Sequence, residues 1–191
     1  MNSSRTTAVS QRESRRKFLR QTAFGAAALW SSTFLPIGCS RYEQVPEEIL
    51  RRLTFFSRHE YVIVKAVAGR LIQKVLPTDP DPNETEVALR ADKFLADAHR
   101  EIQRQFHQLL TVFNSPIFAF LFDLRFSSFL DMKPADQDSY LRDWMTSTIP
   151  FRRTAFQALK RLCMMMYYTD DRTWESMGYK GPFILAGRGE D

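Results

Sequence analysis

Between Cys39 and Met177 the chain has a single glycine, Gly69, while prolines recur along the same stretch. Glycine and proline are the residues that most often mark turns and loops, so long stretches without glycine favour continuous helices. The apolar residues between the prolines recur at spacings of three and four, which is the periodicity of a helix buried on one face. We find no alternating pattern typical of a strand and no internal repeat. The sequence therefore predicts an all-α fold.

About five helices are expected, and they would form a single-domain bundle. Ser57 and Glu60 have the spacing of a capping box and predict where the first helix begins. The third helix begins at Pro116, is rich in phenylalanine and is apolar nearly all round, so we expect it to lie centrally. The expected helices cover residues 57–76, 87–113, 116–129, 134–145 and 150–166.

The amino-terminal segment resembles a twin-arginine export signal. The residues that match its consensus are Ser14, Arg15, Arg16, Phe18 and Leu19. Residues 21–40 carry no charge, and their apolar run is diluted by Gly, Ala and Ser, as in the apolar region of a targeting segment. We therefore expect export to the periplasm by the twin-arginine (Tat) translocase. The alternative is an amino-terminal membrane anchor with a chance Arg-Arg pair.

The end of this segment leaves the fate of the signal open. Leu35-Pro36-Ile37-Gly38-Cys39 resembles a lipobox, and Gly38 fits the small residue that precedes the lipidated cysteine. Pro36, however, stands where an aliphatic residue is expected. Three outcomes follow: a lipid anchor on Cys39, cleavage by an ordinary signal peptidase, or an uncleaved anchor. The first and third would tether the protein to the membrane.

The basic character of the chain belongs to the signal. Residues 1–38 hold six of the 27 basic and one of the 22 acidic residues, which leaves 21 of each in the remainder. A mature part without a basic excess offers no electrostatic footprint for nucleic acid. We divide the chain into a signal at 1–38, a linker at 39–56 and a helical domain at 57–191, a length that suits one domain with a buried core.

No motif in the chain predicts chemistry, so we assign it no catalytic, cofactor-binding or metal-binding residue. The Glu-x-x-His pairs of di-iron bundles, the Cys-x-x-Cys-His of covalent haem and the glycine-rich nucleotide loops are all missing. Cys163 lies in an apolar run and is expected to be a buried, inert thiol. The remaining polar candidates are interpreted as solvated or capping histidines and as a solvated acidic turn; they are His59, His99, His107, Asp79, Asp81 and Glu84.

The carboxyl-terminal segment is the part of the domain that calls for a partner. After the last expected helix it combines large aromatic residues with glycine and proline, and Trp, Tyr and Arg are the residue types that anchor interfaces. The residues predicted to form a partner interface are Trp174, Gly178, Tyr179, Gly181 and Pro182. The alternative is that Trp174 and Tyr179 fold back and cover the protein's own core, and both can be true together.

Two segments of the chain resemble those of a known family, the small subunit 3 of gluconate 2-dehydrogenase and its relatives. The first is Leu76-Pro77-Thr78-Asp79 at the end of the first expected helix. The second is the tail, which reads Tyr168 … Trp174-x-x-x-Gly178-Tyr179-x-Gly181-Pro182. The twin-arginine leader and the number of helices agree with the resemblance, which covers nearly the whole chain.

The resemblance implies a non-catalytic accessory subunit. Its partner would be a large FAD-dependent flavoprotein of the glucose–methanol–choline (GMC) oxidoreductase type, often together with a multihaem cytochrome c subunit. The cofactors, FAD and haem c, would then lie in the partner subunits, and the flavoprotein would leave the cytoplasm with the small subunit. Two other hypotheses stay open: a stand-alone helical envelope lipoprotein or binding module, and an enzyme with an unrecognised metal site.

Overall fold

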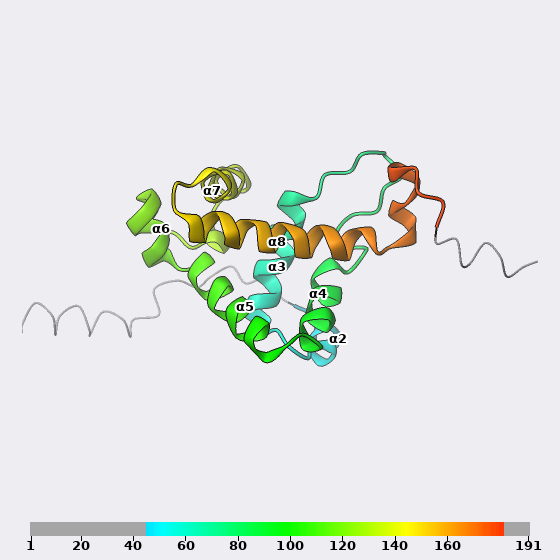
Figure 1. Cartoon of the computed structure of the whole chain (residues 1–191), viewed down its shortest axis with the longest axis horizontal. Coiled ribbons are helices and arrows are strands. Elements are labelled where there is room, and N and C mark those ends of the chain that lie inside the picture. The colour runs from blue at the N-terminus through cyan, green and yellow to red at the C-terminus, as the bar shows by residue number, and fades with distance from the viewer. Residues whose placement is uncertain (1–44, 182–191) are drawn as a thin grey trace, which may run out of the picture. The chain divides into compact units, whose positions relative to one another are not determined.

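The computed structural model describes residues 45–181, and the regular elements in that range are all helices (Figure 1). The predicted all-α fold is therefore confirmed. The export-signal residues, Cys39 and Pro182 lie outside the described residues. The α-helices are α2 (Glu47–Arg52), α3 (Arg58–Leu71), α4 (Val87–Ala96), α5 (Arg100–Phe113), α6 (Pro116–Asp123), α7 (Pro134–Thr146) and α8 (Pro150–Tyr168). Three short 3-10 helices are η2 (Phe129–Asp131), η3 (Asp171–Thr173) and η4 (Glu175–Met177).

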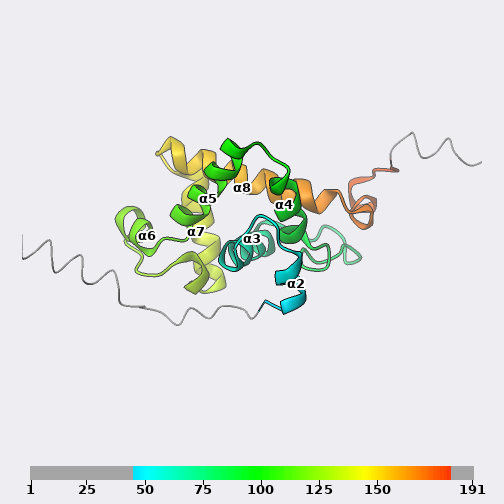
Figure 2. The ribbon, with the colours of Figure 1, turned by 90° about the horizontal axis from the view of Figure 1, so that it is seen from below.

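Helix α8 is the element around which the domain is packed. It has 19 residues, and α3, α4 and α7 all pack against it (Figures 1 and 2). The side chains that α8 buries recur at three- and four-residue spacing, as in Phe156, Leu159 and Cys163. They meet the fully buried Ile63, Val64 and other residues of α3 and α4 in one core.

An aromatic cluster forms the core at the amino-terminal end of α8. Phe113, at the end of α5, lies with its ring centroid 4.8 Å from Phe129, 5.4 Å from Tyr140 and 5.0 Å from Trp144. The Tyr140 hydroxyl donates to the Phe113 carbonyl at 2.9 Å, so its polar group is satisfied although it is buried. This cluster joins α5, η2 and α7.

The start of α3 is organised by a buried carboxylate from another helix. Asp92 of α4 is 0 % exposed and accepts hydrogen bonds from the backbone amides of Thr54, Phe55 and Phe56 and from the Thr54 hydroxyl. Four donors offset the cost of burying the carboxylate. The capping box predicted at Ser57 and Glu60 follows directly and is present.

The long helix predicted at 87–113 is instead two helices, α4 and α5, which meet at an angle (Figure 1). His99 caps α5, since its Nδ1 accepts from the Glu101 amide at 3.3 Å. The Gln103 side chain donates to the carbonyls of Leu95 and Ala96, which closes the end of α4. These local hydrogen bonds make the break at 97–99 stable although the apolar periodicity continues through it.

The phenylalanine-rich segment at 116–129 is not central, and that prediction is wrong. Only Ala119 of α6 is buried, and the large apolar side chains of this helix face outward. The two charged residues of the segment, Asp123 and Arg125, form ion pairs with α8 and α7 and therefore face the domain. Of the phenylalanines of this segment, Phe129 alone enters the core, through η2.

Two further differences concern the first half of the domain. The segment predicted as a linker at 39–56 contains helix α2. The first long helix ends at Leu71, earlier than Pro77, and a loop that lies against the carboxyl-terminal segment connects it to α4. Among the residues that the structure describes, no helix is both long and apolar enough to cross a membrane.

Candidate partner interface at the carboxyl-terminal segment

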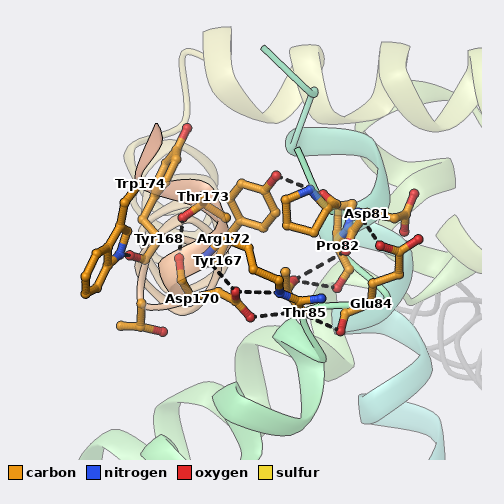
Figure 3. A network of polar contacts seen from close by, with 12 residues as sticks. Asp81, Pro82, Glu84, Thr85, Tyr167, Tyr168, Asp170, Arg172, Thr173 and Trp174 are labelled. Carbon is orange, nitrogen blue, oxygen red and sulfur yellow. Dashed lines mark hydrogen bonds and ion pairs between the residues drawn. The ribbon is translucent and has the colours of Figure 1, made fainter. Parts of the chain in front are cut away.

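The chain after α8 is held in place by one buried carboxylate, Asp170. Its side chain is 4 % exposed and accepts from Arg172 Nε at 2.8 Å and from Arg172 Nη2 at 2.9 Å (Figure 3). It also accepts from Arg90 Nη2 of α4 at 2.9 Å. These bonds, those from Arg172 first, lower the pKa of Asp170 although burial opposes the shift. Asp170 also caps η3, where it accepts from the Arg172 amide.

Arg172 and Tyr167 connect the segment to the loop before α4. Arg172 Nη2 donates to the Glu84 carbonyl at 3.2 Å (Figure 3). The buried Tyr167 hydroxyl donates to the Pro80 carbonyl at 2.9 Å. Both bonds tie the loop to the end of α8, and the buried Tyr167 donor would be costly to leave without its acceptor. Residues some 87 positions apart in the chain therefore lie side by side.

The loop itself is closed by Asp79, which accepts from the backbone amides of Val75 and Leu76, each at 2.9 Å. The bond from Leu76 is the main cause that lowers the pKa of Asp79, while burial raises it; the Val75 amide and the Ser176 hydroxyl also lower it. Ser176 belongs to η4, so this small effect on the pKa of Asp79 comes from the carboxyl-terminal segment. Asp79 is 5 % exposed, and our interpretation of it as part of a solvated turn is wrong.

Trp174 lies at the junction of η3 and η4 and contacts its own chain on three sides. Its Nε1 donates to the Tyr168 carbonyl at 3.2 Å, and its ring meets the Tyr179 ring edge to face at a centroid distance of 5.1 Å. A Cβ at Gly181 would lie 3.2 Å from Trp174 Cζ3. Gly181 has a φ of +97° and Gly178 a φ of +67°, backbone conformations that favour glycine. The half-buried Trp174 thus supports the path of the tail.

The predicted interface residues within the described range therefore lie together, and they differ in exposure. Tyr179 is 46 % exposed and Met177 is equally exposed, whereas Trp174 is half-buried. Four residues of the site were not predicted from the sequence: Asp170, Arg172, Arg90 and Tyr167. The adjacent Asp-Asp-Arg of residues 170–172 is a signal for a capped 3-10 turn, but the link to Arg90 depends on tertiary structure.

The cysteine and the histidines that were considered as candidates for chemistry are buried or bonded within the fold. Burial raises the pKa of the Cys163 thiol to about 12, in agreement with an inert side chain. His107 Nδ1 lies 2.5 Å from Glu60 Oε1, and His59 Nε2 lies 3.0 Å from the Asn114 amide nitrogen. In residues 45–181 no three His, Cys, Asp or Glu side chains are grouped so that they could hold a metal ion.

The protein is thus a small all-α domain whose carboxyl-terminal segment is hydrogen-bonded to the loop before α4. The chain from residue 58 to residue 181 matches the family described as gluconate 2-dehydrogenase subunit 3, and the chain belongs to that family. The matched range begins at the first residue of α3 and ends at Gly181, so it includes both of these segments. Searches of curated proteins and of solved structures gave no match.

Proposed function

We propose that this chain is the non-catalytic accessory subunit of a periplasmic FAD-dependent sugar or alcohol dehydrogenase complex. It would bind the folded flavoprotein, escort it through the twin-arginine translocase and stabilise it afterwards. FAD, and haem c where a cytochrome subunit is present, would be held by the partner subunits. The observation that carries the proposal is the family match from residue 58 to residue 181.

The export signal supports the escort role. The twin-arginine route carries folded proteins, commonly ones that must take up a cofactor before export. Residues 14–20 read Ser-Arg-Arg-Lys-Phe-Leu-Arg, yet we assign no cofactor site to the chain itself. A cofactor bound by a partner that travels with this chain would explain why the small subunit carries such a signal.

The carboxyl-terminal segment supports the binding role. The network around Asp170 holds the segment in one conformation, so little conformational entropy would be lost when a partner binds it. Tyr179 presents an aromatic ring to the outside of this rigid segment. Rigid aromatic side chains of this kind are frequent anchors of protein interfaces.

The escort role can be tested by following the partner. The chain is co-expressed with a signal-less GMC-type flavoprotein from the same organism, and flavin-containing dehydrogenase activity is measured in the periplasm. Replacing Arg15 and Arg16 together with Lys should leave both proteins in the cytoplasm, because the arginine pair is the recognition element. Replacing Arg5 and Arg12, which precede the pair, with Lys is the matched control and should leave export unchanged.

Export of the flavoprotein at the normal level with the double-Lys variant would refute the escort role. Export of the small subunit alone, with the flavoprotein left behind in the wild type, would refute it as well. The subunit could then still act as a stabilising partner after export.

A further inference from the structure

Helix α6 and the residues after it form an exposed apolar ridge, defined here as residues 117–126. Its large apolar side chains are exposed by 37 % (Phe118) to 82 % (Phe126). The other exposed members are Ile117, Phe120, Leu121, Phe122 and Leu124. Taking ~150–250 Å² as the full area of a large apolar side chain, these fractions correspond to roughly 600–1,000 Å². The largest apolar patch of a typical monomer is only about 300–600 Å².

The ridge is free of available charge. The charged side chains of the segment are Asp123, which pairs with Arg152 at 2.7 Å, and Arg125, which pairs with Asp143 at 2.9 Å and donates to Ser139 at 3.0 Å. Both are therefore directed to α7 and α8, and the apolar side chains are left to face outward. Exposed apolar side chains are costly in water, so this orientation favours a surface that is covered in use.

The aromatic rings of the ridge pack against one another. The rings of Phe118 and Phe122 are stacked at 6.0 Å, and those of Phe120 and Phe126 lie 4.7 Å apart. Leu124 has a φ of +53°, a conformation that glycine usually adopts, and its side chain is 75 % exposed. A strained leucine that presents its side chain to the outside is the kind of backbone outlier found at ligand clamps.

An apolar groove lies between α5 and α8. It has a volume of about 580 Å³, and its lining includes Ile102, Phe106, Leu109, Val112, Phe151 and Ala155. Phe151 is 53 % exposed, and the next residue in the first turn of α8 is Arg152, which holds α6 through Asp123. The first turn of α8 therefore contributes to the groove through Phe151 and holds the ridge through Arg152.

We propose that the ridge and the α5–α8 groove together are the principal docking surface for the large partner subunit, through an uncharged apolar face of that subunit. This inference rests on the proposed function. The exposed area is close to the ~800 Å² that each protein contributes to a stable interface of standard size. Aromatic side chains, here four phenylalanines of the ridge, are enriched at such interfaces.

The lack of available positive charge on the ridge argues against a membrane surface as its binding partner. Helices that lie on a membrane combine an apolar face with Lys and Arg on the polar face, often with Trp. Residues 116–126 contain no Lys and no Trp, and their one cation, Arg125, is bound by Asp143. The face of α6 opposite the exposed side chains is covered by the domain itself through Ala119.

The test compares charge insertions at exposed apolar positions. Purified full-length chain with Leu121→Glu and Phe126→Glu should bind the purified flavoprotein at least about thirtyfold more weakly, since interface anchors contribute ~2 kcal/mol or more. Its melting temperature should stay unchanged because both side chains are exposed. Phe94→Glu on α4, which is 48 % exposed and outside the ridge and groove, should leave both binding and melting unchanged.

If something other than the flavoprotein covers the ridge, a distinct experimental result would contradict the proposal in each case. A wild-type mass that doubles on its own and reverts to monomer in the Glu variant would show a second copy of this chain on the ridge. Binding of the wild type, but not of the Glu variant, to vesicles of phosphatidylethanolamine and phosphatidylglycerol would show a membrane contact. A wild type that binds no more of an apolar fluorescent dye than the Glu variant would show that the chain's own termini cover the ridge.

The two proposals fail in different ways. Equal flavoprotein affinity of the wild type and the Glu variant would overturn the docking surface and leave the accessory function standing. A wild-type chain that does not bind the flavoprotein at all would overturn both.

Discussion

Arg152 donates two hydrogen bonds to Asp123, at 3.0 Å to Oδ1 and at 2.7 Å to Oδ2, and so joins the first turn of α8 to the last residue of α6. The two side chains are only 8 % and 10 % exposed. The guanidinium also lies over the rings of Phe122 and Trp144, at 5.6 and 5.2 Å from their centroids. Because α6 buries little of its own apolar surface, its position depends heavily on this one pair.

Removing Arg152 should therefore destabilise the domain strongly. Arg152→Ala leaves the Asp123 carboxylate buried without its partner, which typically costs ~3–5 kcal/mol of the free energy of unfolding. Chemical denaturation of the isolated subunit measures the effect. The neighbouring Arg153, whose side chain bonds the Ser147 carbonyl at an exposed position, is the matched control, and Arg153→Ala should cost less than about 1 kcal/mol. Equal effects of the two variants would show that the pair does not hold α6.

The carboxylates of the candidate site predict the acid side of the stability curve. The pKa values of Asp170 and Asp79 are lowered in the folded protein, chiefly by hydrogen bonds from Arg172 and from the Leu76 amide. The pKa of Glu60 is lowered too: burial raises it, but bonds from His107 and Ser57 outweigh that effect. A carboxyl with a lowered pKa stabilises the fold above its unfolded pKa, about 4, and loses that contribution as the pH falls through the folded value.

Thermal melting should accordingly be insensitive to pH between about 7 and 5 and fall steeply below about 4. Asp170→Asn should melt at a lower temperature at pH 7 and show a shallower fall in acid, because one of the titrating groups is gone. Asp171→Asn changes an exposed neighbour and should reproduce the wild-type curve. If the plot of melting temperature against pH for Asp170→Asn runs parallel to that of the wild type at every pH, Asp170 does not contribute to the acid dependence.

Alanine variants of Tyr179 and Trp174 should distinguish an effect on partner binding from an effect on the stability of the subunit. Tyr179→Ala should weaken association with the flavoprotein while melting changes little, because its ring is 46 % exposed in the free subunit. A loss of ~2 kcal/mol corresponds to a roughly thirtyfold lower affinity. Trp174→Ala should lower both, since its ring supports Tyr179 and the backbone at Gly181.

Association constants and melting temperatures of the two variants, measured on the same preparations, decide the matter. If Tyr179→Ala melts several degrees lower and binds the partner normally per folded molecule, the tail is a cover for the protein's own core.

The periodicity of the sequence predicted the helical class and several boundaries because these depend on local chemistry. Pro116, Pro134 and Pro150 each begin a helix, and the Ser57 capping box starts α3. The division of 87–113 was missed because the caps at His99 and Gln103 are side-chain hydrogen bonds that leave the apolar stripe intact.

The exposure of α6 was missed for another reason. From its sequence alone, a helix that is apolar nearly all round is predicted to lie in the core. In the structure, Asp123 and Arg125 pair with α8 and α7, so the charged side chains face the domain and the apolar side chains face outward. The candidate site was predicted in part. The aromatic and glycine residues of the tail were identified from their types, but the Asp170 network joins Arg90, Glu84 and Arg172 across about 80 positions of the chain. No local pattern contains that information.

The most direct test of the central claim is purification of the tagged chain from the periplasm of cells that also produce the signal-less flavoprotein. The accessory role predicts that the large subunit comes with it in near-stoichiometric amount, with flavin absorbance and dye-linked dehydrogenase activity in the same fraction. The chain purified from cells without the flavoprotein should show neither. Flavin absorbance or sugar oxidation by the chain alone, or a tagged chain that brings no flavoprotein with it, would contradict the account.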